Sequence, residues 1–207
     1  MEINEENNMN NHDKDIDAGK KSQQNSILSY LHDVVYGLVG VLLIFMLVFR
    51  VVVVSGPSME NTLIDGDGLI LLGNVFYKNP HYGDIIVASK ESFKDGEPII
   101  KRVIATEGQK VDIDFEKGIV YVDDVALKET YTKTPTNLPE GMSFPLVVDE
   151  GCVFVMGDNR NDSMDSRSPE IGLLDRREIL GKVLFLALPG VTGGSGERDF
   201  SRIGVLW

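Results

Sequence analysis

Cysteine and histidine are scarce in this sequence, and their scarcity excludes several kinds of site. The chain of 207 residues has one cysteine, Cys152, and three histidines. A single cysteine cannot form an internal disulfide, and its setting in GCVFVMG predicts a buried strand in which cysteine acts as a small apolar side chain. No group of cysteines and histidines has the spacing of a zinc site. We therefore expect neither a metal nor a cofactor.

Basic residues are also few in comparison with acidic ones. The chain has 20 Lys and Arg against 32 Asp and Glu, which gives a formal net charge of −12. A protein that binds nucleic acid needs a basic face to contact the phosphates. The charge balance therefore argues against nucleic acid as a partner.

Charge is missing altogether from Val34 to Phe49, and Arg50 is followed by four valines. Together these residues make a run of about 21, close to the ~20 needed to cross a bilayer. A cleavable signal peptide has a shorter apolar core near the start and a small-residue cleavage site, and a buried core helix rarely lacks a polar face for so long. The run predicts an uncleaved membrane helix.

The positions of the nearest cations indicate how the chain crosses the membrane. Lys20 and Lys21 precede the apolar run, whereas the next cation after Arg50 is Lys78. Positive residues favour the cytoplasmic side. We expect a disordered cytoplasmic tail over residues 1–29, rich in polar residues and poor in apolar ones, a transmembrane helix over 30–54, and an extracytoplasmic domain over 55–207. The protein would then be a single-pass protein of the cell membrane.

Beyond the apolar run the sequence has the pattern of short strands bounded by Gly, Asp, Asn or Pro, which is typical of an antiparallel, mainly β domain. KVDIDFEKGIVYV predicts a hairpin that turns at 116–118. Asp175 and Glu178 have the spacing of a capping box and give the one helical signal in this part of the chain. The predicted strands are LILL at 69–72, DIIVA at 84–88, PIIKRVIA at 98–105, KVDIDF at 110–115, GIVYV at 118–122, CVFVM at 152–156 and KVLFLA at 182–187.

Ser58, in the segment VSGPSMENTL that follows the apolar run, is a candidate nucleophile. A serine becomes a good nucleophile when a neighbouring base takes its proton. Among the histidines, two precede or adjoin the membrane run, and His81 lies in NPHYGD, which favours a solvated turn over a catalytic base. A loop could also carry SGPS for turn chemistry alone.

Lysine is an alternative base, because burial in apolar surroundings favours its neutral form. In PIIKRVIA, a period of two places Lys101 on one strand face with Ile99 and Val103, and Arg102 on the other face. Arginine cannot lose its proton in practice, so a base in this strand is Lys101. The alternative is an edge strand from which the lysine side chain reaches water.

The stretch MGDNRNDSMDSR, residues 156–167, is the third informative segment. Its density of Asp, Asn, Ser and Arg is typical of a strand-to-loop junction with many side-chain hydrogen bonds. A catalytic interpretation requires more, because a neutral lysine must be held toward Ser58. A hydroxyl such as that of Ser163 could orient the amine without favouring its charged form.

With these residues in view, the sequence resembles the type I signal peptidases, which are membrane-anchored serine proteases with a Ser-Lys dyad. SGPSMENTL resembles the nucleophile box, GDIIVA at 83–88 the next box, KRVIATEG at 101–108 the lysine box and GDNRNDSMDSR at 157–167 the last; GLLDRREILGKVLF and RIGVL also fit. Four boxes in this order behind one anchor are strongly specific. The absence of a long inserted second domain is similar to the short Gram-positive type.

The resemblance implies roles for individual residues. Ser58 is expected to be the nucleophile and Lys101 the general base, with Ser163 orienting the lysine. The backbone N–H of Ser58 is expected to form half of the oxyanion hole; Gly56 stands where some relatives have a serine hydroxyl, which leaves the second donor open. The supporting set is expected to contain an Asp165–Arg167 ion pair, an Asp158–Arg102 ion pair and the loop-fixing residue Asn159.

The resemblance also implies the substrate and the partners. Secretory preproteins with small residues before the cleavage site would be hydrolysed through an acyl-enzyme on Ser58, and the lipid bilayer would hold the enzyme. The extended substrate would lie between Val52–Gly56 and Pro98–Lys101 and pair through backbone hydrogen bonds. Two rival hypotheses are a self-cleaving Ser-Lys domain of the repressor type, which the anchor disfavours, and an anchored domain that binds extracytoplasmic partners.

Overall fold

The computed structural model describes residues 29–191 and 196–206, and the chain divides into two compact units, residues 1–47 and 48–207. The tail predicted over residues 1–29 lies outside the described residues except for Ser29. Each unit is described by itself below.

The apolar run forms a helix over Ser29–Val48 that is long and apolar enough to cross a membrane. The helix was expected to reach residue 54, but residues Phe49–Val53 instead form strand β1. β-Branched valines favour extended backbone, and β1 has an antiparallel partner strand that takes up its backbone hydrogen bonds. A count of apolar residues cannot separate such a strand from the end of a helix.

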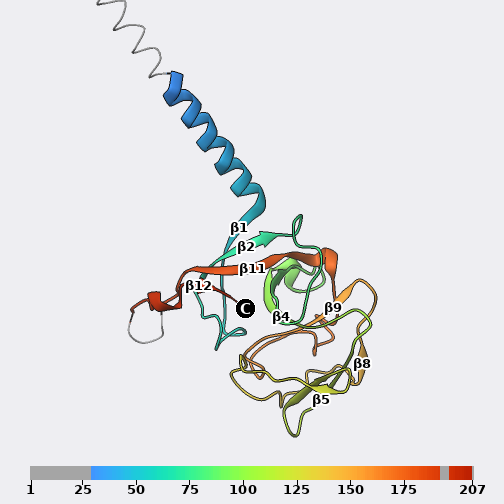
Figure 1. The fold of residues 1–207 in the computed structure, drawn as a ribbon. Coiled ribbons are helices and arrows are strands. Elements are labelled where there is room, and N and C mark those ends of the chain that lie inside the picture. The colour runs from blue at the N-terminus through green and yellow to red at the C-terminus, as the bar shows by residue number, and fades with distance from the viewer. Residues whose placement is uncertain (1–28, 192–195, 207) are drawn as a thin grey trace, which may run out of the picture. The chain divides into compact units, whose positions relative to one another are not determined.

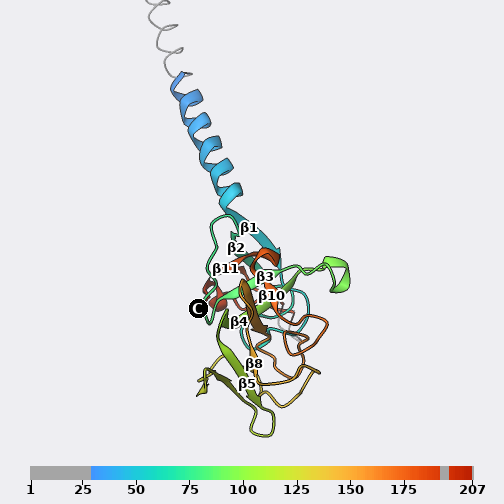
Figure 2. The same ribbon diagram turned by 90° about the vertical axis from the view of Figure 1, so that its right-hand side faces the viewer.

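The second unit is mainly β and antiparallel, as the sequence predicts, and its strands form two sheets (Figure 1). The larger has the order β1-β2-β11-β3-β4-β9-β10 with β12 beside β11, and the smaller has the order β7-β6-β5-β8. Figure 2 shows β5 and β8 at the end of the unit farthest from β1 and β2. The strands are β1 (Phe49–Val53), β2 (Gly68–Gly73), β3 (Ile85–Ala88), β4 (Ile99–Thr106), β5 (Lys110–Asp114), β6 (Ile119–Val122), β7 (Val125–Ala126), β8 (Leu146–Val147), β9 (Cys152–Met156), β10 (Leu174–Asp175), β11 (Ile179–Leu188) and β12 (Gly204–Val205); the 3-10 turns are η1 (Lys94–Gly96), η2 (Arg176–Glu178) and η3 (Phe200–Arg202).

The sequence predictions for this unit are confirmed in their main features. All seven predicted strands are present, and β5 and β6 form the predicted hairpin. Gly118 ends its turn with φ +69°, a left-handed value that suits glycine. Asp175 and Glu178 form the predicted capping box, but the turn that they cap is the three-residue η2. Four strands were not predicted, because a strand of two residues is too short to show an alternating pattern: β7, β8, β10 and β12.

Strand β4 lies at the centre of the apolar core. Its side chains contribute to three separate clusters of packed apolar residues: Ile100 packs on the first, Val103 belongs to the second and Ile104 to the third. Both faces of β4 are therefore buried, and Lys101 and Arg102 are only 4% and 2% exposed. The sequence pattern required one cation to share an apolar face, and the fold buries both.

Candidate active site

The segment that carries Ser58 is held in place by backbone and carboxylate contacts. Directly after β1, the N–H of Val54 donates to the carbonyl oxygen of Asp67 at 2.8 Å, and the N–H of Gly66 donates back to the carbonyl oxygen of Val54 at 2.9 Å. Gly56 has φ +87°, and its N–H donates to Oδ1 of Asp65 at 2.8 Å. The chain therefore turns at Gly56 in a conformation that favours glycine and presents Ser58 two residues later.

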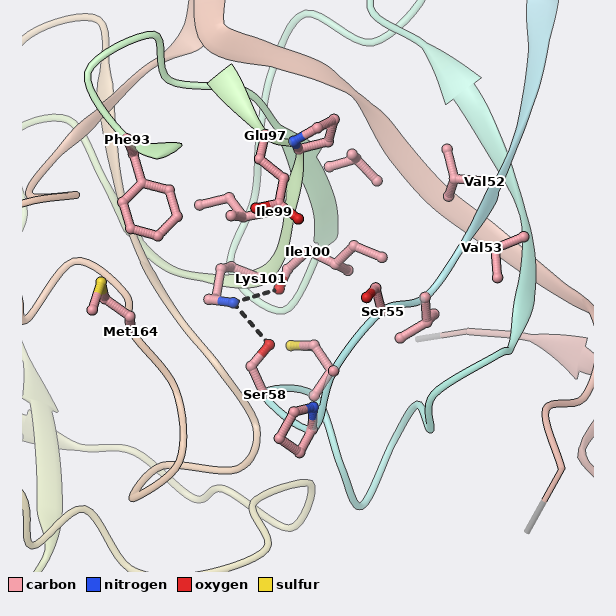
Figure 3. A pocket seen from close by; sticks show the side chains of 16 residues that line it. Val52, Val53, Ser55, Ser58, Phe93, Glu97, Ile99, Ile100, Lys101 and Met164 are labelled. Atoms are coloured by element: carbon pink, nitrogen blue, oxygen red, sulfur yellow. Dashed lines mark hydrogen bonds between the residues drawn. The ribbon is translucent and has the colours of Figure 1, made fainter. Parts of the chain in front are cut away.

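Ser58 and Lys101 meet in the structure although they lie 43 positions apart in the sequence. A hydrogen bond joins Nζ of Lys101 to Oγ of Ser58 at 2.9 Å, and Nζ also donates to the carbonyl oxygen of Ile100 at 3.0 Å. Figure 3 shows both contacts. The two hydrogen bonds thus direct the amine of Lys101 toward the Ser58 hydroxyl and hold it to the backbone of its own strand.

Both side chains line a cavity of about 530 Å³ whose walls are mainly apolar. Figure 3 shows Val53 and Ser55 on one side of the Ser58–Lys101 pair and Phe93 and Met164 on the other. The full lining consists of residues 52–59, Val87, Phe93, residues 97–101 and Met164.

The backbone N–H groups of Ser58 and Gly56 differ in their hydrogen-bond partners. Among the described residues, none accepts a hydrogen bond from the N–H of Ser58. The N–H of Gly56, by contrast, is occupied by Asp65. The Ser58 N–H as an oxyanion donor stays a prediction, whereas Gly56 forms the turn before Ser58.

Arg102 and Asp158 form a buried ion pair next to Lys101. Nε and Nη2 of Arg102 donate to Oδ1 and Oδ2 of Asp158 at 2.9 and 2.7 Å, and Nη1 donates to the carbonyl oxygen of Gly83 at 2.8 Å. The hydroxyl of Thr62 donates to Oδ2 of Asp158 at 2.5 Å, and the ring of Tyr131 lies 4.1 Å from the guanidinium. The pair therefore connects the lysine strand to the serine segment.

Asn159 contacts the serine segment directly. Its Nδ2 donates to the carbonyl oxygen of Pro57 at 3.1 Å, and its backbone N–H donates to the carbonyl oxygen of Ser58 at 3.0 Å. The carbonyl groups on either side of the Ser58 Cα are thus fixed by one residue.

Asp165 and Arg167 form a second buried pair. Nε and Nη2 of Arg167 donate to Oδ1 and Oδ2 of Asp165 at 2.9 and 2.8 Å, and both side chains have no exposed surface. Oδ2 of Asp165 also accepts the N–H of Gly157 at 3.0 Å. A Cβ at position 157 would overlap both Oγ of Ser163 and the carbonyl oxygen of Ser58, so this glycine allows residues 157–167 to approach Ser58.

Ser163 lies beside this contact, but the expected hydrogen bond to Lys101 is not formed. Its Oγ is buried and has no hydrogen-bond partner among the described residues. The orienting role of Ser163 stays a prediction.

Glu140 is a further carboxylate at Arg167. Its Oε1 lies 3.0 Å from Nη2 of Arg167, and its side chain is 13% exposed. Burial and the neighbouring charge of Asp165 raise the pKa of Glu140 to about 7, against the opposing effect of Arg167. This carboxylate therefore titrates near neutral pH.

Comparison with known proteins identifies the family. The family model described as "Signal peptidase, peptidase S26" matches residues 27–188. The chain belongs to the signal peptidase family. The match spans the helix and every residue that the site comprises.

Individual signal peptidases resemble the chain over most of its length. A probable signal peptidase I-1 of a Synechocystis strain is 38% identical over 68% of this chain and 72% of its own. A signal peptidase I of Bacillus licheniformis is 30% identical over 81% of this chain and 92% of its own. A crystal structure of a signal peptidase I from Enterococcus faecalis is 29% identical, covers 51% of this chain and 97% of its own, and has a TM-score of 0.41.

In this signal peptidase, several residues around the site were not predicted from the sequence. Thr62 stands inside the nucleophile box, where its hydroxyl could have been considered. Tyr131 and Glu140 come from the long segment before β8, and Phe93 from the loop before β4. Their neighbours in the fold lie far away along the chain, so no local pattern marks them.

His81 was expected to lie in a solvated turn. His81 has a side chain that is 78% exposed and does not line the cavity. Across residues 29–191 and 196–206, no group of three or more Cys, His, Asp or Glu is arranged to hold a metal ion.

Proposed function

We propose that this signal peptidase is a membrane-anchored serine endopeptidase that removes N-terminal signal peptides from secreted preproteins, with Ser58 as nucleophile and Lys101 as general base. The observation that carries the proposal is the 2.9 Å contact between Nζ and Oγ inside an apolar cavity. Burial disfavours an ammonium ion, and Lys101 is 4% exposed. A neutral amine can donate to the Ile100 carbonyl and still accept the proton of Ser58.

The first half of the reaction forms an acyl-enzyme. Lys101 takes the hydroxyl proton of Ser58 as Oγ attacks the scissile carbonyl carbon, and the oxyanion that results accepts the Ser58 N–H. The C–N bond then breaks, and Lys101 gives its proton to the departing amine nitrogen. In the second half, Lys101 takes a proton from water, the hydroxide attacks the ester carbon, and the proton passes from Lys101 to Oγ as the ester C–O bond breaks. The signal peptide leaves with a carboxyl group, which then loses its proton to water.

The open strand edges support an extended substrate. In β4, residues Ile99–Lys101 pair with β3, whereas β9 pairs only from Arg102 onward. Strand β1 lies at the edge of its sheet. A preprotein segment could add to both edges by backbone hydrogen bonds, between Val52–Gly56 and Pro98–Lys101.

The side chains beside those edges support a preference for small residues. An added strand would point alternate side chains toward the face that carries Val54, Met59 and Ile100, and these residues pack on the first core cluster. Large substrate side chains would have to displace that packing, whereas alanine-sized ones would not.

The anchor and its orientation are part of the proposal. A 20-residue apolar helix supports a single crossing, and the cations before it support a cytoplasmic N-terminus. The catalytic unit would then meet preproteins on the extracytoplasmic side of the cell membrane.

The test is cleavage of a purified preprotein by the detergent-solubilised full chain. Ser58→Ala and Lys101→Met are each expected to lower turnover by at least about 1,000-fold, because nucleophile and base act as a unit. Ser143→Ala and Lys128→Met change the same residue types at exposed positions and are expected to keep full turnover. Cleavage that survives Ser58→Ala, in a protein with wild-type circular dichroism, would refute the dyad.

A further inference from the structure

The segment before the C-terminus reaches the nucleophile-bearing loop through one arginine. Nη1 and Nη2 of Arg202 donate to Oδ1 and Oδ2 of Asp67 at 2.8 and 2.6 Å, and Nη2 also donates to the carbonyl oxygen of Thr62 at 3.3 Å. Asp67 is fully buried. The contact is a bidentate pair between residues 135 positions apart in the sequence.

Asp67 holds the segment around Ser58 in place through several hydrogen bonds. Its carboxylate also accepts the N–H of Ile64 at 2.8 Å and that of Gly190 at 2.6 Å. Its carbonyl oxygen accepts the N–H of Val54, directly before the turn that presents Ser58. Both ends of the loop from Val54 to Asp67 therefore depend on the position of this aspartate.

Thr62 connects the Arg202–Asp67 pair to β4, the strand that carries Lys101. Its carbonyl oxygen faces Arg202, and its hydroxyl donates to Oδ2 of Asp158 at 2.5 Å. Asp158 in turn holds Arg102, the residue after Lys101. Two arginine–aspartate pairs, one on each side of Thr62, thus join the C-terminal segment, the serine loop and β4.

We propose that Arg202 is a positioning residue of the reaction, which fixes Ser58 relative to Lys101 through Asp67 and Thr62. The proposal rests on the function proposed above. Because Arg202 does not line the substrate cavity, its loss should misplace the nucleophile without removing substrate contacts. A misplacement of about 1 Å can cost a factor of about 100 in rate.

The test compares variants of the solubilised full chain on a preprotein. Arg202→Gln is expected to lower kcat by about 10- to 100-fold and to change KM by less than about twofold. Arg202→Lys keeps a charge but cannot bond both Asp67 oxygens and the Thr62 carbonyl in the same way, so its kcat should lie between those of Arg202→Gln and the wild type.

Arg198→Gln is the matched control. Arg198 is an exposed arginine of the same segment that donates to the carbonyl oxygen of Pro189, and its replacement is expected to leave kcat unchanged. Thr62→Val removes only the hydroxyl link. Its effect on kcat should be less than additive with that of Arg202→Gln, because both act on one path.

Wild-type kcat in both Arg202→Gln and Arg202→Lys would overturn the proposal, as would a loss of activity that matches the unfolded fraction by circular dichroism. If Arg202→Gln does not fold, Arg202→Lys decides: a kcat lowered at unchanged KM supports the role, and a wild-type kcat rejects it. Cleavage that persists in Ser58→Ala would instead refute the dyad, so the two failures are distinct.

Discussion

At the scale of single residues, two consecutive basic residues in β4 have different hydrogen-bond partners. Arg102 is neutralised by the Asp158 carboxylate, with two hydrogen bonds. Lys101 is directed to the hydroxyl of Ser58 and the carbonyl oxygen of Ile100. Removal of one partner from a buried ion pair is strongly destabilising, whereas a buried lysine can give up its proton. This difference agrees with the roles proposed for them, structural support by Arg102 and proton transfer by Lys101.

Glu140 gives a pH-dependent prediction at this scale. The fold raises its pKa from 4.5 to about 7, so the folded protein holds a proton that the unfolded chain releases at lower pH. The stabilisation is complete below about pH 4.5 and is lost as the pH rises through about 7. Glu140→Gln cannot titrate. From pH 5 to pH 8 the wild type should lose, relative to this variant, on the order of 1–2 kcal/mol of unfolding free energy.

Denaturant unfolding of the solubilised chain, followed by circular dichroism at the two pH values, measures this difference. Glu150→Gln, at an exposed position, should alter the unfolding free energy by less than about 0.5 kcal/mol at either pH. A constant difference between wild type and Glu140→Gln across the range would contradict the prediction.

At the scale of elements, β11 is the strand that joins the two parts of the large sheet. It pairs with β2 along one edge and with β3 along the other, so it connects the strand next to β1 with the strand next to β4. The segment that carries Ser58 follows β1, and Lys101 lies on β4. The distance between Ser58 and Lys101, the two side chains of the proposed dyad, therefore depends on close packing at β11.

Gly181 in β11 provides a test of that packing. A Cβ there would overlap the carbonyl oxygen of Leu72 and lie 3.2 Å from its carbonyl carbon, both of which are backbone atoms of β2. Gly181→Ala is expected to destabilise the protein by about 1–3 kcal/mol, the usual cost of overpacking, and to lower the thermal unfolding midpoint.

Gly204→Ala, in β12, is the control for the same change in another strand. No atom lies within 4 Å of the Cβ that it would add, so its unfolding midpoint should stay near that of the wild type. Equal midpoints for the two variants would show that β11 tolerates the extra methyl group.

At the scale of the whole molecule, the prediction concerns topology. In a Cys152→Ser background, a cysteine at the exposed turn position Glu116 is expected to react with a membrane-impermeant maleimide added to intact cells. A cysteine at Ser22, before the helix, is expected to react only after the membrane is permeabilised, because positive residues mark the cytoplasmic side. The reverse labelling pattern would mean that the catalytic unit faces the cytoplasm.

The sequence by itself determined the fold class, the order of the elements and the candidate dyad. Strand periodicity and turn residues are local signals, and they located seven strands. The boxes around Ser58, Lys101 and residues 157–167 are also continuous stretches, so a resemblance could identify them without coordinates. The valines after Arg50 show where a local signal fails, since apolar length alone does not distinguish the end of a membrane helix from a strand.

Only the tertiary structure decided which distant residues share the site. Arg202 reaches Asp67, Thr62 reaches Asp158 and Glu140 reaches Arg167, and each pair joins segments that are far apart in the sequence. Such contacts follow from strand pairing and loop paths, which no spacing rule specifies. The burial of Lys101 is likewise set by the clusters packed on both faces of β4. Sequence could name the lysine as a candidate base, but its surroundings are a property of the fold.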